Sequence, residues 1–405
     1  MAKNESKSVN SALSDVTSVK SKKSSEVSDS RTVEWTYIWL SGDGSIRSAV
    51  FNSVGKTPKV QRFDGSACKQ ASTDNSDLFL VPVRVVSDVL FGNDSISPTS
   101  SIVLCEVQTA DGTPHASNSR ADLKKFLLKN SKLSTVKIGM DQDILFIDPD
   151  TRQPYSWPLG KNEKGEEQVV FPGPQGRYYG GTGDFVRGRR IMSSIVDRMN
   201  YRGINIRSYN PAICLSQWTY SVQENDIMTA CDDLIISRYL CESVAEEETS
   251  PRCVVSYTPK SFPGTEWNGS GCIFRLYLEN YTSSGGNASL AKSICETLGQ
   301  DHREHIAAYG SGNEARLVGK TGGISDYNKF SWGFGDKTAS ICVPTIPLMG
   351  DSTDHVYFED RRPSAGVDPY VGVLALCRSL VGVLDLQVPT KAEVSAKEFE
   401  PKLVS

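Results

Sequence analysis

The hydrophobic pattern changes character along the chain, and this change constrains the fold more than any other feature. Runs rich in β-branched and aromatic residues come first, separated by Gly, Asn and Asp, and they predict strands. Beyond residue 109, predicted helices and strands alternate. A group of strands followed by a mixed region predicts an α+β fold with two domains. The early runs are VEWTYIWL at 33–40, SIRSAVF at 45–51, DLFLVPVRVV at 77–86 and SSIVLCEVQ at 100–108.

A polar stretch, TADGTPHASNSR at 109–120, separates the two regions. We therefore expect one domain over 31–112 and a second over 113–405. In the second region, apolar residues at three- and four-residue spacing predict helices, and β-branched runs predict strands. The predicted helices cover 121–129, 187–201 and 224–247, and the predicted strands cover 137–148 and 203–210.

Residues 1–30 are dominated by Ser, Lys and acidic residues and contain no aromatic residue. Such a segment cannot bury a core, so it is predicted to be a disordered tail, and its acidic residues argue against a transit peptide. The 405-residue chain has a net charge of −4 and ten cysteines without a CxxC pair. Its apolar runs are too short to cross a bilayer. We expect a cytoplasmic protein with reduced thiols and neither a nucleic-acid nor a membrane partner.

The sequence MDQD at 140–143 places Asp141 and Asp143 on one face of a predicted strand, because alternate side chains of a strand point the same way. Neighbouring carboxylates repel unless a cation or a proton lies between them. The pair therefore indicates a divalent-metal site. Solvated strand residues are the alternative interpretation of these two aspartates taken alone.

Six separated motifs together resemble the eukaryotic-type glutamine synthetases over residues 33–380. The resemblance implies a β-grasp-like N-terminal domain and a catalytic-type domain with a curved antiparallel sheet and flanking helices. It also implies stacked rings with sites between subunits, and ATP-dependent ligation of ammonia to glutamate with Mg or Mn. The motifs are RFDGSACKQASTDNSDLFLVP at 62–82, FPGPQGRYYGG at 171–181, WNGSGC at 267–272, HIAAYGSGNEARLVG at 305–319, FSWGF at 330–334 and YFEDRRPSA at 357–365.

By this resemblance, Asp141, Asp143 and Glu359 match metal carboxylates of the family. The family's EQE is DQD here, and a lost methylene moves each carboxylate by about 1.5 Å. Asp141 with Glu359 would still suffice for one Mg²⁺, which often takes one or two protein carboxylates. The other expected ligands, two glutamates and a histidine, are replaced by Ala212, Thr219 and Ile273. The flap glutamate is missing from 320–329, where Gly322 or Gly323 replaces it.

The resemblance implies roles for several further residues. Lys337 and Cys342 stand where the family has two arginines, and lysine keeps the charge without the bidentate geometry. Cys342 is interpreted as a buried thiol. The implied roles are catalytic for Asp64 and Arg361, substrate-binding for Arg316, Gly269 and Asn268, and nucleotide-binding for Lys337 and Arg361.

These replacements predict a retained framework around a depleted site. The favoured hypothesis is a catalytically inactive or strongly impaired homologue with a structural or regulatory role, in a homo-oligomer of rings or with an active paralogue. Binding of ATP, Mg or Mn by this chain is doubtful on this interpretation. A working glutamate–ammonia ligase of glutamine biosynthesis and a nucleotide or amino-acid sensor are the alternatives. His302 and His305, three residues apart on a predicted helix, are interpreted as structural because no third metal ligand is near.

Overall fold

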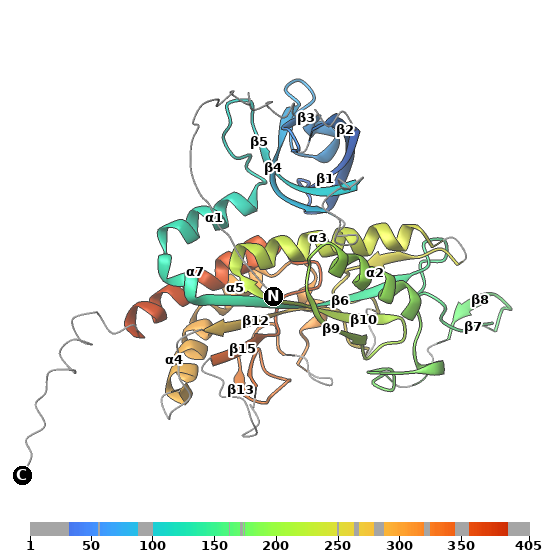
Figure 1. Cartoon of the computed structure of the whole chain (residues 1–405). Coiled ribbons are helices and arrows are strands. Elements are labelled where there is room, and N and C mark those ends of the chain that lie inside the picture. Colours follow the sequence, from blue (N-terminus) through green and yellow to red (C-terminus); the bar gives the residue numbers. More distant parts are fainter. Residues whose placement is uncertain are drawn as a thin grey trace, which may run out of the picture.

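The computed structural model describes residues 32–387 except 56, 88–99, 162, 171–172, 174, 249–250, 263–266, 279–286, 320–324 and 345–355. The predicted tail at 1–30 lies outside these residues, as do Gly322 and Gly323 of the flap segment. Within them, helices and strands combine in an α+β fold, as predicted (Figure 1).

The N-terminal region is a five-stranded sheet in the order β2-β1-β5-β4-β3. Its neighbours are antiparallel except β1 and β5, which run parallel. On β1, Trp35, Tyr37 and Trp39 point into the core of this sheet, whereas Ile38 packs into the larger core. Both faces of β1 are therefore buried at these positions. The strands are β1 (Thr32–Leu40), β2 (Ile46–Val54), β3 (Gln61–Asp64), β4 (Asp77–Ser87) and β5 (Ser100–Gln108).

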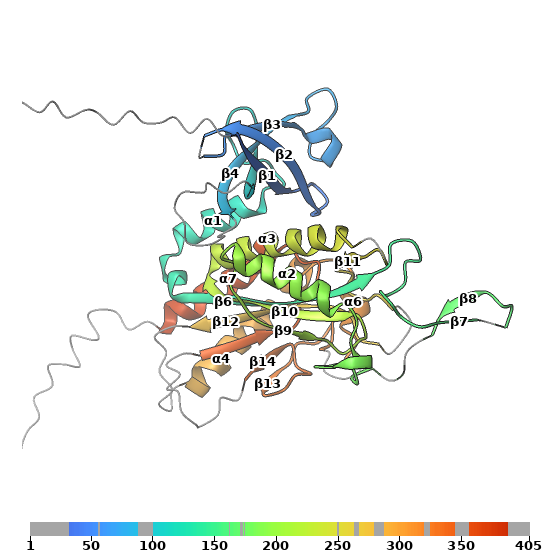
Figure 2. The same ribbon diagram turned by 45° about the vertical axis from the view of Figure 1, so that its right-hand side comes forward.

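The second region holds an eight-stranded sheet in the order β13-β14-β15-β12-β6-β10-β9, with β11 also pairing with β6. Its strands are β6 (Val136–Ile147), β9 (Ile206–Pro211), β10 (Gln217–Asp226), β11 (Val254–Ser256), β12 (Cys272–Leu278), β13 (Trp332–Phe334), β14 (Ile341–Val343) and β15 (Val356–Asp360). A separate hairpin joins β7 (Leu159–Lys161) to β8 (Glu167–Val169) and projects to one side (Figure 2).

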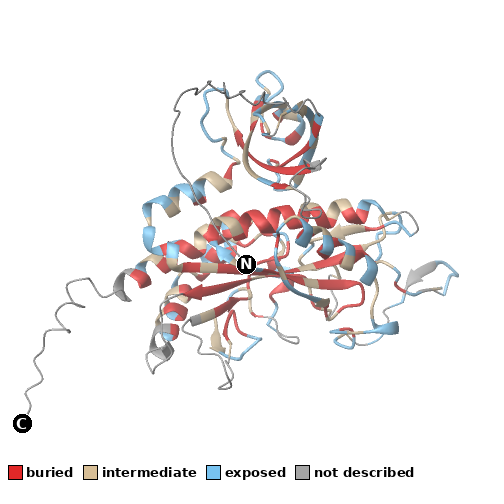
Figure 3. Cartoon of the chain, viewed as in Figure 1, coloured by how far each residue is buried: buried red, intermediate tan, exposed pale blue. Residues whose placement is uncertain are grey.

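Helices α2, α3 and α7 cover one face of this sheet, between it and the N-terminal region (Figures 1 and 2). The buried residues concentrate along α3 and the central strands beneath it (Figure 3). None of the helices in the described ranges is long and apolar enough to cross a membrane. The helices are α1 (Ser119–Lys129), α2 (Arg189–Tyr201), α3 (Ile227–Glu246), α4 (Asn287–Gln300), α5 (His302–Ala308), α6 (Asn313–Arg316) and α7 (Pro369–Gln387).

The central strand β6 separates an apolar face from a polar one. Met140 and Ile144 are buried under the helices, and Gln142 between them is also fully buried. The side-chain amide oxygen of Gln142 accepts hydrogen bonds of 2.9 and 2.7 Å from Arg238 of α3. This buried amide therefore links α3 to the sheet. Because side chains alternate along a strand, Asp141 is left on the opposite face.

The predicted helix over 224–247 is wrong at its start, since α3 begins at Ile227. Asn225 and Asp226 still pair with β6 as the end of β10. Asp226 then caps α3, because its carboxylate accepts the amide of Thr229 at 3.0 Å. Strand pairing with a distant segment therefore decides this boundary. The domain division at 112/113 falls between β5 and α1 and stays a prediction.

Ion pairs join the N-terminal sheet to α3. Arg84 of β4 lies 2.5 Å from the carboxylate of Asp233. Arg120 of α1 lies 2.6 Å from Glu106 of β5 and makes a two-bond contact with Asp232, at 2.8 and 2.9 Å. Both arginines are mostly buried. The two sheets are thus linked through charged groups as well as through apolar packing.

Candidate functional site

A cavity of about 540 Å³ lies on the sheet face opposite α2 and α3. As predicted, Asp141 and Asp143 share this face. The cavity brings together almost all residues assigned by the resemblance. These are Asp141, Asp143, Ala212, Thr219, Asn268, Gly269, Ile273, Arg316, Lys337, Glu359 and Arg361.

Asp143 is satisfied by donors of the protein itself. Thr219 stands opposite it in the β10–β6 register, and its hydroxyl donates a 2.6 Å bond to the carboxylate. The backbone amide of Gly271 donates a second bond of 2.9 Å. Burial raises the pKa of Asp143, against the lowering effect of these two bonds. Thr219 is therefore a hydrogen-bond donor to Asp143.

Asp141 faces a guanidinium that sequence reasoning missed. Arg275 of β12 is buried, and its Nε lies 2.9 Å from Oδ1 of Asp141. Its NH2 donates a 2.7 Å bond to the carbonyl of Val222, which requires the side chain to cross β6 at Gly139. A Cβ at Gly139 would lie 2.7 Å from that nitrogen, so a side chain there would displace the guanidinium. Burial raises the pKa of Asp141, and Arg275 acts in the opposite direction.

Glu359 is also matched by cations of the chain. Lys337 Nζ lies 2.5 Å from its carboxylate and Arg361 NH1 lies 3.2 Å from it. The hydroxyl of Tyr357 donates a further bond of 3.2 Å. Glu359 stands opposite Arg275 in the β12–β15 register, so the two clusters adjoin.

Arg316 lines the cavity, but most of its donors serve the fold. Its Nε donates to Asn313 at 2.9 Å, and its NH2 reaches the carbonyls of Arg361, Arg362 and Pro363 at 3.2, 2.6 and 2.9 Å. Burial lowers the pKa of Arg316 to about 10, which leaves it charged at neutral pH. Most hydrogen bonds of the predicted substrate-binding arginine therefore connect α6 to the segment after β15.

The neighbouring residues Asn268 and Gly269 are fixed in place by contacts with Gln175 and Pro259. A Cβ at Gly269 would lie 1.7 Å from the carbonyl oxygen of Pro259, so this position admits only glycine. The backbone amide of Asn268 donates a 2.7 Å bond to the side chain of Gln175. Both residues therefore shape the wall of the cavity.

The residues present do not fit the metal set expected from the resemblance. Ile273 stands opposite Asp141 and offers no lone pair. Among the described residues, no three His, Cys, Asp or Glu side chains are grouped so as to hold a metal ion. The Arg275 guanidinium, whose Nε lies 2.9 Å from Asp141, would repel a divalent ion bound to that carboxylate.

Asp64 and Cys342 are not among the residues that line the cavity, although Cys342 is paired with Glu359 between β14 and β15. Asp64 sits at the exposed end of β3, where its carboxylate accepts the amide and hydroxyl of Ser66 at 2.9 and 2.6 Å. These bonds lower the pKa of Asp64. Cys342 is fully buried, and burial raises the pKa of its thiol, so it is not an activated nucleophile. All ten cysteines are buried and unpaired.

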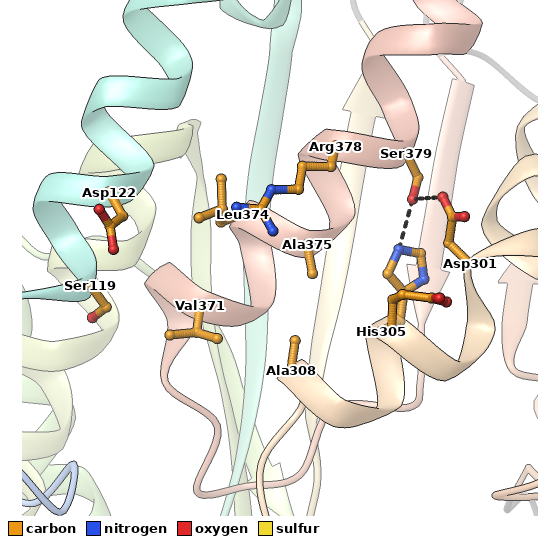
Figure 4. A pocket seen from close by; sticks show the side chains of 11 residues that line it. Ser119, Asp122, Asp301, His305, Ala308, Val371, Leu374, Ala375, Arg378 and Ser379 are labelled. Atoms are coloured by element: carbon orange, nitrogen blue, oxygen red, sulfur yellow. Dashed lines mark hydrogen bonds between the residues drawn. The ribbon is translucent and has the colours of Figure 1, made fainter. Parts of the chain in front are cut away.

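A second cavity, of about 480 Å³, lies between α1, α5 and α7 (Figure 4). His305 Nε2 lies 2.9 Å from Ser379 Oγ, which in turn donates a 2.5 Å bond to Asp301. Arg362 donates to Nδ1 of His305 at 3.1 Å, so Nε2 carries the proton and donates to Ser379. A histidine in this tautomer cannot take the serine proton, so the group is not a hydrolytic triad.

His302 and His305 are structural, in agreement with their interpretation from the sequence. The Nδ1 of each accepts a 3.1 Å bond from Arg362, whose side chain is fully buried. Burial, followed by the nearby guanidinium, lowers the pKa of His305 to about 4. The neutral imidazole is therefore the form that the fold stabilises.

This environment predicts a loss of stability on acidification. A histidine whose folded pKa lies below its unfolded value of about 6.5 stabilises the fold above that pH. The contribution is lost as the pH falls from about 6.5 to about 4, and it amounts to up to about 3 kcal/mol. In urea denaturation at pH 7 and pH 4, His305→Gln should lose less stability than the wild type. The control is His115→Gln, in the segment between β5 and α1, and equal losses in all three proteins would contradict the prediction.

No family model matches the chain. The chain is 36% identical over 347 residues to the glutamine synthetase nodule isozyme of Medicago sativa, covering 83% of this chain and 90% of that protein. It is 35% identical to the glutamine synthetase of Agaricus bisporus, covering 84% and 90%. It is 33% identical over 345 residues to the glutamine synthetase root isozyme 4 of Zea mays, covering 83% and 90%.

Proposed function

Because the chain belongs to the glutamine synthetase family, we propose that it is a member that no longer catalyses metal-dependent ligation and serves as a structural or regulatory subunit. The sheet register carries this proposal. It sets Ile273 against Asp141 and Thr219 against Asp143, where the family resemblance requires a histidine and a glutamate. Divalent ions held by carboxylates neutralise the charge that develops in phosphoryl transfer. A site without these ligands loses that stabilisation.

The absence of a flap glutamate from the sequence over 320–329 acts in the same direction. Loss of a general base alone lowers a rate by about 10²- to 10⁴-fold. The metal ligands and the general base would stabilise the same transition state, so losing both lowers the rate further than losing either one. We therefore expect an activity below detection.

Assembly is the property that the chain would keep on this proposal. We propose that it forms rings, alone or with an active relative, in the cytoplasm. Asp64 supports shared sites, because it is exposed on the N-terminal sheet and apart from its own chain's cavity. A relative named as a cytosolic isozyme, from Medicago sativa, supports the location.

The test measures both the catalytic activity and the molecular mass of the protein. Purified full-length protein is incubated with ATP, glutamate, ammonia and Mg²⁺ or Mn²⁺, and the glutamine formed is measured beside a γ-glutamyl transfer assay. We expect no product above background from a protein that light scattering shows to be a large oligomer. Metal-dependent glutamine formation would overturn the loss of activity, and a monomeric mass would overturn the structural role.

A further inference from the structure

The cavity carries more positive than negative charge from its own side chains. Three carboxylates line it, those of Asp141, Asp143 and Glu359. Five cationic side chains line it as well, so the excess is two positive charges. The cations are Arg207, Arg275, Arg316, Lys337 and Arg361.

We propose that Arg275 and Lys337 take the place of divalent ions as built-in counter-ions, so that the cavity binds a phosphate-type dianion without metal. This inference rests on the proposed function and goes beyond it, because it gives the inactive site a ligand class and a metal-free mode of binding. Its basis is that each cation already contacts a carboxylate that the resemblance assigns to metal. The two contacts are 2.9 Å for Arg275 with Asp141 and 2.5 Å for Lys337 with Glu359.

The position of Arg275 is built into the sheet. Its side chain is 3% exposed and runs over Gly139 to the carbonyl of Val222. A second carboxylate, of Glu224, lies 3.9 Å from its NH1. A buried guanidinium with two carboxylate neighbours and a backbone acceptor cannot leave its place to admit a metal ion. The counter-ion is therefore a fixed part of the site.

Donors for an anion remain at the cavity. Arg361 Nε is buried without a hydrogen-bond partner in the described structure. Lys337 keeps 53% of its side chain exposed and can turn toward a ligand. Arginine and lysine side chains around the cavity match a phosphate dianion, whose oxygens accept several N–H bonds.

The test uses the full-length protein and inorganic phosphate, measured by calorimetric titration and thermal shift in EDTA, then with Mg²⁺ or Mn²⁺. We expect the same phosphate affinity in all three conditions and no shift from either metal alone. Phosphate binding that requires metal would overturn the inference while leaving the proposed inactivity intact. Glutamine formation in the assay above would instead overturn the proposed function. A parallel titration with a nucleoside monophosphate shows whether the cavity prefers a phosphate ester or free inorganic phosphate.

Two variants separate a counter-ion from a structural residue. Lys337→Gln removes a half-exposed cation, and we expect about a tenfold loss of phosphate affinity in EDTA. Arg275→Gln should lose as much and should gain stabilisation by Mn²⁺, because Asp141 is then left without its cation. Arg62→Gln, in an exposed pair with Asp77, is the matched control. Unchanged phosphate affinity in Lys337→Gln would overturn the inference even if Arg275→Gln fails to fold.

Discussion

Arg362→Met is expected to lower the free energy of unfolding by about 3–5 kcal/mol, because it leaves a buried carboxylate without its cation. The side chains of Arg362 and Asp360 are both fully buried and lie 2.6 Å apart. Burial alone would raise the pKa of Asp360, but the ion pair, together with a bond from Tyr309, holds it below its usual value. The charged form is thus the native form, and without Arg362 it must be desolvated unpaired.

The loss should spread beyond the pair. Arg362 also donates to His302 and His305, and its guanidinium lies 5.3 Å from the ring centre of Tyr309. One side chain therefore holds α5 against the end of β15. The measurement is urea denaturation at pH 7, followed by circular dichroism.

The control is Arg252→Met, which breaks an ion pair with Asp150 whose two side chains are 60% and 65% exposed. Exposed pairs contribute about 0–1 kcal/mol, so this variant should remain close to the wild type. The double variant Arg362→Met with Asp360→Leu should recover part of the loss, since no buried charge then remains. Equal stabilities of Arg362→Met and Arg252→Met would contradict the argument.

Local patterns in the sequence were sufficient for features that depend on neighbours along the chain. The shared face of Asp141 and Asp143 follows from the two-residue period of a strand, and the structure confirms it. The apolar spacing of α3 predicted that helix, but placed its start at 224 instead of at Ile227. The family resemblance identified most of the residues that line the cavity, because related proteins with the same fold keep their motifs in the same order.

Features that depend on register were beyond such reasoning. Arg275 sits in the run CIFRLYL, where it reads as a single charge in a buried strand. Its partner Asp141 becomes apparent only once β12 is aligned with β6, which are far apart in the sequence. Arg316 was assigned to substrate, but its NH2 donates to carbonyls of a segment that only the fold brings near. Long-range pairing therefore decides which charges at this site are free to act.

Arg120→Met is the second change for which we expect a large effect, about 3–5 kcal/mol lost from the free energy of unfolding. Arg120 is 13% exposed and contacts two carboxylates that are themselves buried, Glu106 at 8% and Asp232 at 4%. Without the arginine, two like charges remain together in a buried contact between β5, α1 and α3. Tyr370 of α7 still donates a 2.7 Å bond to Asp232, but one neutral donor cannot replace a two-bond guanidinium.

The location of Arg120 predicts how the variant fails as well as how much stability it loses. Because the arginine joins the N-terminal sheet to α3, its removal should loosen that contact before either core melts. Hydrogen exchange should therefore rise first along β5 and the start of α3, while β6 stays protected. Arg62→Met, in the N-terminal sheet but exposed, should leave both exchange and stability unchanged. Uniform exchange along the whole chain in Arg120→Met would instead mean that the two sheets melt as one unit.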